Sequence, residues 1–348
     1  MTKKGQRPAL TDSAWVPAVA RAEFAATLGV NQLDAETVSA YDEQLLRFGG
    51  EVSRETPPIV PLPRPIAPRV IAVSNQKGGV GKTSTAVNLA AALAEGGLTV
   101  LVIDMDPQGN ASTALGIDRH QEHLLGVYDV LAGDRPLMRT VRPCPDLPDL
   151  WVAPATIDLA GAEIELVTMD AREFRLRTAV LRLRERLERN RIGPPDYILI
   201  DCPPSLGLLT LNALVAADEV LIPIQCEYYA LEGLTQLMRT VGLVQASLNP
   251  GLSLGAILLT MYDARTRLAA QVAEEVRTHF PQSVLKATIP RTVRISEAPS
   301  YGQSVITYDP NGVGAHSYRE AAREIAIRSA DSRQPMTGVT LTEGVRHE

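Results

Sequence analysis

The chain has 348 residues, of which 45% are hydrophobic and only 4% aromatic, and this predicts one large domain with an aliphatic core plus appendages. Its net charge of −6 argues against a uniformly basic nucleic-acid-binding protein but leaves room for a local basic patch. There is no run of 18 apolar residues and no signal-peptide pattern, and the three cysteines (Cys144, Cys202, Cys226) form no Cys-x-x-Cys pair. We therefore expect a cytoplasmic protein without a membrane span.

The first 68 residues differ in pattern from the rest of the chain. Residues 57–68 contain six prolines in twelve positions, which predicts an extended linker outside the packed core. Residues 1–56 contain two short helical patterns, near 14–28 and 35–48. A helix-turn-helix is one interpretation, but Asp34 just before the second segment and three acidic residues within it oppose insertion into a DNA groove. We favour an N-terminal extension, with short helices or no fixed structure, that either binds a partner or has a role the sequence does not define.

Strand-like and helical patterns alternate over residues 69–328. The strand-like runs are 70–74, 99–103, 150–153, 197–200, 220–224 and 254–260. The helical segments lie near 84–95, 160–191, 207–217, 230–248, 267–279 and 315–328. This alternation predicts an α/β fold, a mostly parallel sheet with helices on both faces, in which ligands bind beyond the carboxyl ends of the strands. The polar segment 329–348 is expected to be a disordered tail.

The most informative stretch is the glycine loop at residues 75–84, Asn-Gln-Lys-Gly-Gly-Val-Gly-Lys-Thr-Ser, which joins the first strand to an alanine-rich helix. Glycines let backbone N–H groups curl around phosphate oxygens, and the helix amino terminus adds its positive end. Lys82 would neutralise the β- and γ-phosphates, and the hydroxyl of Thr83 would ligate Mg²⁺. The usual first glycine of such a loop is replaced by Gln76, and an additional lysine, Lys77, follows it. The sequence therefore predicts a nucleotide site.

Aspartates follow two of the expected strands. Asp104 and Asp106 follow the second, where strand alternation would put both on one face, and Asp201 ends the fourth. A lone aspartate at a strand end is often a turn or cap residue. Together with the glycine loop, however, the three predict a phosphoryl-transfer site in which Asp201 holds the Mg²⁺ shell.

These motifs resemble the ParA/Soj family of chromosome- and plasmid-partitioning ATPases, which are P-loop NTPases of the deviant Walker A group. The resemblance covers residues 69–328, whereas the first 68 residues and the tail have no counterpart in the short chromosomal members. The matching segments are 75–83, 104–110, 154–156, 159–163, 201–207, 225–233 and 289–300. It implies an ATPase that requires Mg²⁺.

The resemblance also implies a role for each site residue. In this family ATP drives formation of a sandwich dimer, and Lys77 would reach the partner's phosphates as an arginine finger does. Asp106 would position the attacking water, and Asp104 would be structural. Thr83 would ligate Mg²⁺ directly and Asp201 through water. The implied nucleotide contacts are Lys77, Gly78, Gly79, Val80, Gly81, Lys82, Thr83 and Ser84, with Pro290 near the adenine; Lys77, Lys82 and Asp106 would be catalytic.

Binding of double-stranded DNA without sequence preference is the other implied property. Arg265 and Arg294 match surface arginines that contact DNA in the family. Residues 263–294 carry six Lys or Arg and three Asp or Glu, a local charge of +3 in an acidic chain. Such a patch should bind phosphates in a salt-sensitive way, and a dimer would double it. Residues 171–191 hold eight arginines and three glutamates; a solvated helix face is the favoured interpretation, and a second DNA contact stays open.

The function we expect is an ATP-dependent dimerising switch on the nucleoid. It would segregate a chromosome or a plasmid with a ParB-like centromere-binding partner, and slow hydrolysis would reset the dimer. The alternative is a MinD-like positioning ATPase, but that needs a C-terminal amphipathic helix, and Pro335 and Gly338 interrupt the polar tail. A metal-delivery relative would need paired cysteines. The sequence does not distinguish chromosome from plasmid cargo.

Overall fold

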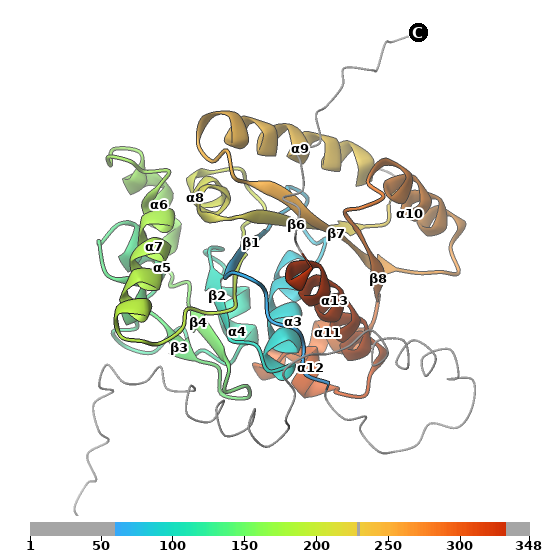
Figure 1. Cartoon of the computed structure of the whole chain (residues 1–348), viewed down its shortest axis with the longest axis horizontal. Helices are drawn as coiled ribbons and strands as arrows, with labels where there is room; N and C mark the ends of the chain where they lie inside the picture. Colours follow the sequence, from blue (N-terminus) through green and yellow to red (C-terminus); the bar gives the residue numbers. More distant parts are fainter. Residues whose placement is uncertain (1–59, 228–229, 332–348) are drawn as a thin grey trace, which may run out of the picture. The chain divides into compact units, whose positions relative to one another are not determined.

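The computed structural model of the chain describes residues 60–227 and 230–331 (Figure 1). The chain divides into two units, one comprising residues 1–57 and 185–194 and the other residues 58–184 and 195–348. Of the first unit, only 185–194 lie within the described residues; the second carries the sheet and the site discussed below. The expected extension 1–56 and residues 332–348 of the expected tail lie outside the described residues.

An eight-stranded sheet forms the centre of the second unit, in the order β3-β4-β2-β5-β1-β6-β7-β8. All neighbouring pairs are parallel except β3 with β4. The strands are β1 (Arg69–Val73), β2 (Val100–Asp104), β3 (Arg142–Pro143), β4 (Leu150–Ala153), β5 (Tyr197–Asp201), β6 (Glu219–Gln225), β7 (Ser253–Tyr262) and β8 (Val284–Pro290). The predicted mostly parallel α/β sheet is confirmed.

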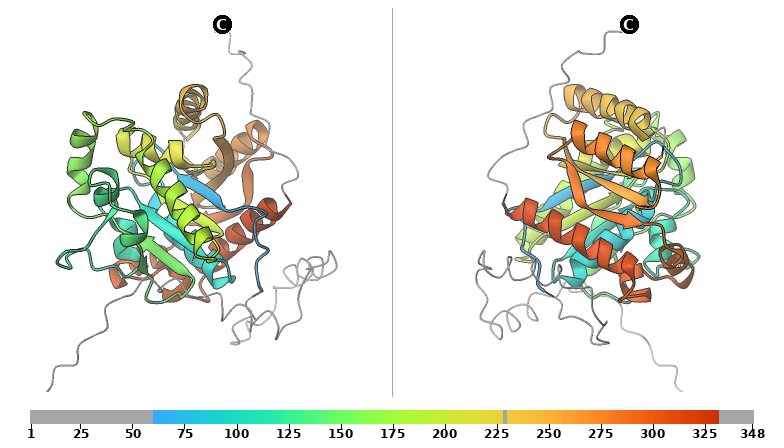
Figure 2. Two further views of the ribbon diagram at one scale, coloured as in Figure 1. Left: turned by 60° about the vertical axis from the view of Figure 1, so that its left-hand side comes forward. Right: turned by 90° about the vertical axis from the view of Figure 1, so that its right-hand side faces the viewer.

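Helices cover both faces of this sheet, as Figure 2 shows most clearly in its right-hand view, where α9 and α10 lie on one side and α13 on the other. On the α13 side lie α3 (Lys82–Glu95), α4 (Asn110–Ala114), α12 (Val305–Tyr308) and α13 (Val313–Ala330). The opposite layer includes α8 (Leu208–Ala216), α9 (Ala230–Ser247) and α10 (Arg267–His279). The remaining helices are α5 (Val127–Leu131), α6 (Leu159–Leu166), α7 (Arg175–Arg189), α11 (Val293–Glu297) and the 3₁₀ turns η1 (Leu137–Arg139) and η2 (Ala298–Tyr301).

The core follows from the composition of the elements. Every residue of β2 and β5 is buried, as expected for strands covered on both faces. Helix α3 is rich in alanine, and its small buried side chains let it approach the sheet closely. No helix among the described residues is long and apolar enough to cross a membrane.

The structure differs from the sequence-based expectation in several elements: the short β3, α4, α5, α11 and α12 were not anticipated, and three others differ as follows. The single helix expected over 160–191 is two helices, α6 and α7, separated by a turn in which Ala171 has a positive φ of 48°. The strand β8 was not anticipated because exposed Lys286 interrupts its apolar pattern at the sheet edge. Helix α13 continues to Ala330, two residues into the segment expected as a tail.

The proline-rich segment, expected to be a spacer outside the core, makes specific contacts from residue 60 onward. The amide of Leu62 donates to the Gly96 carbonyl at 2.9 Å, and the Leu62 side chain packs so closely on Gly96 that a Cβ there would lie 2.5 Å from it. Nη1 of Arg64 donates to both carboxylate oxygens of Asp196, each at 3.0 Å. The segment is thus extended, but it lies against the end of α3.

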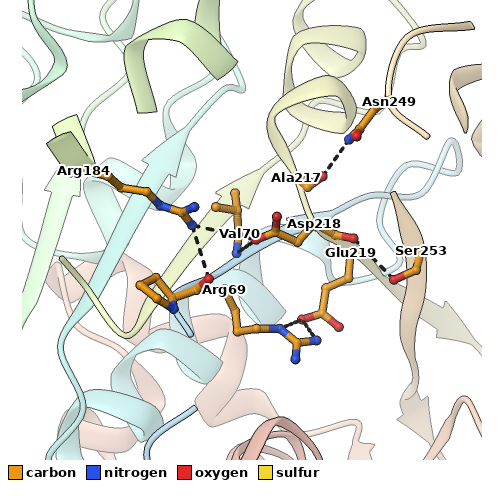
Figure 3. Close-up of polar contacts among 9 residues, drawn as sticks. Arg69, Val70, Arg184, Ala217, Asp218, Glu219, Asn249 and Ser253 are labelled. Carbon is orange, nitrogen blue, oxygen red and sulfur yellow. Dashed lines mark hydrogen bonds and ion pairs between the residues drawn. The ribbon is translucent and has the colours of Figure 1, made fainter. Parts of the chain in front are cut away.

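A network of polar contacts holds the amino ends of β1, β6 and β7 together (Figure 3). Arg69 pairs with Glu219 at 2.7 Å, and the Asp218 carboxylate accepts the Val70 amide at 2.8 Å. Arg184 lies 3.8 Å from the same Asp218 carboxylate. Asn249 donates to the Ala217 carbonyl at 2.7 Å. This edge of the sheet, opposite the carboxyl ends of the strands, is therefore held by charges with partners.

Candidate nucleotide site

Three strands that are neighbours in the sheet bring the predicted groups together. The order β2-β5-β1 places the glycine loop after β1 beside Asp201 at the end of β5 and Asp104 at the end of β2. Asp104 and Asp201 are register partners, and the Met105 amide donates to the Asp201 carbonyl at 2.9 Å. Because the carboxyl ends of parallel strands meet at one edge, residues about 100 positions apart in sequence form one site.

The glycine loop has the backbone conformation that its sequence predicts. Gly79 and Gly81 have φ values of 76° and 87°, a region that favours glycine, and Gly81 is the N-cap of α3. A Cβ placed on Gly78 or Gly79 would meet nothing within 4 Å, so the space beside the loop is open to a ligand.

Hydrogen bonds to the neighbouring strands β6 and β7 hold the glycine loop in place. The Asn75 side-chain amide donates to the Pro223 carbonyl at 2.8 Å, while its Oδ1 accepts the Lys77 amide at 3.0 Å. The Thr260 hydroxyl donates to the Val80 carbonyl at 2.8 Å. Sequence reasoning did not assign a role to Asn75 or Thr260, because each acts through backbone contacts that only the sheet order creates.

Lys82 is directed into the site. Its side chain is 7% exposed, and Nζ donates to the Lys77 carbonyl at 2.9 Å across the loop. Burial lowers the pKa of Lys82, and the nearby carboxylate of Asp201 opposes that effect. A buried ammonium beside the glycine loop is well suited to an anionic ligand.

Lys77 has a different environment from Lys82. Its Nζ lies 2.6 Å from Oε2 of Glu227, which follows β6, and the Gln225 amide donates to the other oxygen of that carboxylate. The side chains of Lys77 and Glu227 are 42% and 47% exposed, so their ion pair is worth at most about 1 kcal/mol. Glu227 was not predicted as a site residue, although it lies within one of the segments that carry the family resemblance.

The two buried aspartates on adjacent strands differ in their partners. Asp104 accepts three hydrogen bonds: from the Ser112 hydroxyl at 2.6 Å, from the Ser112 amide at 2.8 Å and from the Asp106 amide at 3.2 Å. Burial nevertheless raises the pKa of Asp104 to about 6. This satisfied carboxylate fits the structural role that was expected of it.

Asp201 is fully buried, and neither of its carboxylate oxygens has a hydrogen-bond partner of sound geometry within residues 60–227 and 230–331. Burial and the charge of Asp104 raise the pKa of Asp201 well above its usual range, although the nearby Thr83 hydroxyl lowers it somewhat. An unsatisfied buried carboxylate costs free energy unless something binds it. Its oxygens beside Thr83 are a donor set that fits Mg²⁺, which prefers carboxylate and hydroxyl oxygens.

Asp106 lies beyond the end of β2, because that strand ends at Asp104. Strand alternation, on which the sequence-based placement relied, therefore does not apply to it. Its side chain is 8% exposed, and Oδ1 accepts the Gln108 amide at 2.9 Å. Asp106 lies in a turn at the same edge as the glycine loop.

The other predicted residues lie farther along the same edge. Thr83 and Ser84 occupy the first turn of α3. Pro290 ends β8, in register with Tyr262 and separated from β1 by β6 and β7. Arg265 lies in the turn after β7 and Arg294 in α11, just after β8, so both DNA-binding candidates follow neighbouring strands.

Both of these arginines are exposed and paired within their own segments. Arg265 forms a bidentate contact with Asp263 at 2.8 and 2.9 Å, which lowers the pKa of that carboxyl to about 2. Arg294 pairs with Glu297 at 3.1 Å. Each guanidinium can therefore exchange its carboxylate for another anion.

A strand, a glycine loop and a helix, with buried carboxylates at the ends of two adjacent strands, define a P-loop NTPase. A protein-family model described as an AAA domain matches residues 68–254. The chain is 54% identical over 261 residues to the chromosome partitioning protein ParA of Myxococcus xanthus, covering 75% of this chain and 88% of that protein. It is 54% identical over 258 residues to the sporulation initiation inhibitor protein Soj of Bacillus subtilis, covering 74% of this chain and 98% of that protein.

A solved structure of cobyrinic acid a,c-diamide synthase from Mycobacterium smegmatis, with bound ATP analogue and magnesium, has the same fold. It matches with a TM-score of 0.65 and 38% identity, covering 79% of this chain and 100% of that chain. The chain belongs to the ParA/Soj family of chromosome-partitioning ATPases.

Proposed function

We propose that this ATPase is a nucleotide-dependent dimerising switch that binds DNA without sequence preference and segregates DNA with a ParB-like centromere-binding protein. ATP and Mg²⁺ are its cofactors. The observation that carries the switch is the contrast between the two lysines of the loop. Lys82 is buried and serves its own site, whereas Lys77 is exposed at the loop entrance in an ion pair weak enough to exchange.

The division of labour we propose within one site follows from these surroundings. The loop from Gly78 to Gly81 cradles the phosphates, Lys82 neutralises them, and Ser84 contacts the α-phosphate. Thr83 binds Mg²⁺ directly and Asp201 holds it through water. Bound Mg²⁺ neutralises charge on the transferring phosphoryl group. Pro290 lies near the adenine of the bound nucleotide.

Hydrolysis in this proposal needs two chains. Lys77 leaves Glu227 and supplies a cation to the phosphates bound by the partner copy, as an arginine finger does. Asp106, in its turn beside the loop, orients the attacking water. Because the catalytic site is complete only in the dimer, nucleotide state controls oligomeric state, and slow hydrolysis resets the switch.

DNA binding is assigned to Arg265 and Arg294. Both arginines follow neighbouring strands at the carboxyl ends of the parallel strands, which we call the carboxyl edge of the sheet. Their carboxylate partners are exposed, so a DNA phosphate can replace them. Dimerisation doubles the set of arginines, so binding should depend on ATP and fall steeply with salt. A protein that binds DNA in this way would associate with the nucleoid. The role of residues 1–59 is left open.

The test is retention of random-sequence duplex DNA by the purified chain with ATP, with ADP and without nucleotide, across a salt series. Salt-sensitive binding only with ATP supports the switch. Lys77→Ala should bind ATP but fail to dimerise, with Lys286→Ala as the matched control for loss of a lysine. DNA binding that is indifferent to nucleotide, or dimerisation by Lys77→Ala equal to wild type, would contradict the proposal.

A further inference from the structure

An exposed pair of stacked tyrosines lies beside Arg294. The ring centroids of Tyr301 and Tyr308 are 5.0 Å apart with an angle of 23° between the rings, and Tyr301 is 66% exposed. The guanidinium carbon of Arg294 lies 5.9 Å from the centre of the Tyr308 ring. We call Arg294, Tyr301 and Tyr308 the tyrosine platform. Its residues come from α11, η2 and α12, three short elements after β8.

The rings restrain the charge of Arg294 without neutralising it. A cation over an aromatic face is attracted by the ring quadrupole, and this limits the conformations of a long side chain. The Glu297 carboxylate contacts the guanidinium at 3.1 Å, but the side chains of both residues remain 60% and 42% exposed. Arg294 is thus held in one place with its charge accessible to solvent.

A buried asparagine joins the platform to the glycine-loop helix. The Val305 amide, at the start of α12, donates to Oδ1 of Asn88 at 2.6 Å, and the Asn88 amide donates to the Ser84 carbonyl at 2.7 Å. Asn88 is 3% exposed. The helix that carries Tyr308 is therefore fixed to the first turn of α3, so the platform is already formed in a single chain.

We propose that the tyrosine platform is an extended DNA-backbone contact, in which Tyr308 positions Arg294 and the Tyr301 hydroxyl donates to a phosphate oxygen. Tyrosine hydroxyls are among the groups that contact the DNA backbone, and a ring with two rotatable bonds loses little entropy on binding. The inference rests on the proposed DNA binding and adds two residues that carry no charge. The inference gives a function to the exposed rings of Tyr301 and Tyr308, which DNA binding by the arginines alone does not require.

The experiment measures affinity for a short random-sequence duplex with ATP, by fluorescence anisotropy across a salt series. Tyr308→Leu should weaken binding about two- to fivefold, whereas Tyr308→Phe, which keeps the ring but loses the hydroxyl that contacts Arg294, should lose less. Tyr301→Phe should weaken binding about two- to tenfold, the worth of one hydrogen bond. Neither loss should change the slope of log affinity against log salt, because no charge is removed.

Two controls separate this inference from the proposed function. Arg294→Ala should lower the salt slope by about 0.9 for each arginine lost, and Tyr128→Phe, a partly exposed tyrosine on α5, should change nothing. If Arg294→Ala changes neither affinity nor slope, the assigned DNA contact fails. If it weakens binding while Tyr308→Leu and Tyr301→Phe both match wild type, the platform is overturned and DNA binding stands. A loss in Tyr308→Phe equal to that in Tyr308→Leu also overturns it; an unchanged circular-dichroism spectrum and melting temperature show that each variant is folded.

Discussion

Buried acids have different surroundings at the two ends of the parallel strands, which we call the amino edge and the carboxyl edge of the sheet. At the amino edge, Glu219 is 8% exposed, and although burial raises its pKa, Arg69 at 2.7 Å opposes the shift. At the carboxyl edge, Asp201 is fully buried, and burial and the charge of Asp104 raise its pKa well above its usual range although Thr83 and Lys82 oppose the shift. At one edge the buried acid has a cationic partner, and at the other the buried carboxylate costs free energy until a ligand binds.

The cations follow the same division. Arg69 is fixed in a mostly buried pair, whereas Lys77, Arg265 and Arg294 have exposed carboxylate partners at the carboxyl edge. Exposed pairs contribute little to stability and are easily exchanged. The comparison indicates that residues at the amino edge contribute to stability, whereas residues at the carboxyl edge bind ligands. Substitutions at the two edges should therefore affect stability and binding separately.

The largest effect is expected at Lys82. Lys82→Ala should weaken ATP binding about 30-fold or more, because a buried cation facing the phosphates is lost. Its stability should change little, since the removed charge was itself desolvated. Titration with a fluorescent ATP analogue measures this, and Lys286→Ala, at an exposed position on β8, is the control. Unchanged affinity in Lys82→Ala would mean that the glycine loop is not the nucleotide site.

At the amino edge the expectation is reversed. Arg69→Ala should lower the free energy of unfolding by about 2 kcal/mol, because Glu219 is left buried without its partner. ATP affinity of the folded protein should be unaffected. Urea denaturation measures the loss, and the double variant Arg69→Ala with Glu219→Gln should recover part of it. A loss of ATP binding without a loss of stability would contradict the division between the edges.

Asp201→Asn should raise the free energy of unfolding and lower the rate of ATP turnover. Replacing a buried carboxyl whose ionisation burial strongly disfavours should raise the free energy of unfolding of the nucleotide-free protein by about 1–3 kcal/mol at pH 7. Mg²⁺-dependent ATP turnover should fall at the same time, since the carboxylate that fits the metal is gone. Denaturation and phosphate release are measured on the same preparation. A destabilised Asp201→Asn would show that the carboxylate has a partner in the folded chain.

The pH dependence of stability should report on Asp104. Its folded-state pKa is about 6, above the ordinary value of about 4, so the folded protein retains the proton between these pH values. Its contribution to stability is therefore greatest below about pH 4 and declines as pH rises through 6. The stability of Asp104→Asn relative to wild type should accordingly increase from pH 4 to pH 7. A constant difference across that range would mean that Asp104 titrates normally.

The smallest effect is expected at Glu227. Glu227→Gln removes a pair worth at most about 1 kcal/mol, so stability should barely change. Lys77 is freed, however, and under the proposed mechanism half-maximal dimerisation should need up to about fivefold less ATP. Light scattering against ATP concentration measures the shift, with Glu274→Gln on the exposed side of α10 as control. No shift would mean that the ion pair does not compete with the partner's phosphates.

Local motifs predicted much of the site. The glycines, Lys82 and Thr83 are contiguous in sequence, and their chemistry requires only that a strand precedes and a helix follows. Asp201 was predicted because it ends an apolar run. In contrast, the contacts of Glu227, Asn75 and Asn88 were not predicted, although the first two lie in segments that carry the family resemblance, because each acts on a segment far away in the chain. Strand alternation does not account for the position of Asp106, because β2 ends two residues earlier.

The sequence by itself determined the fold class, the nucleotide loop and the family, because strand–loop–helix periodicity and contiguous motifs are local properties of the chain. It also determined which charged side chains the protein contains. Only the tertiary structure decided which charges find partners: the order β2-β5-β1 sets Asp104 beside Asp201, and β6 brings Glu227 to Lys77. Burial and pairing depend on neighbours that are distant in sequence, and they fix the pKa values and exchangeable contacts on which the proposed switch depends.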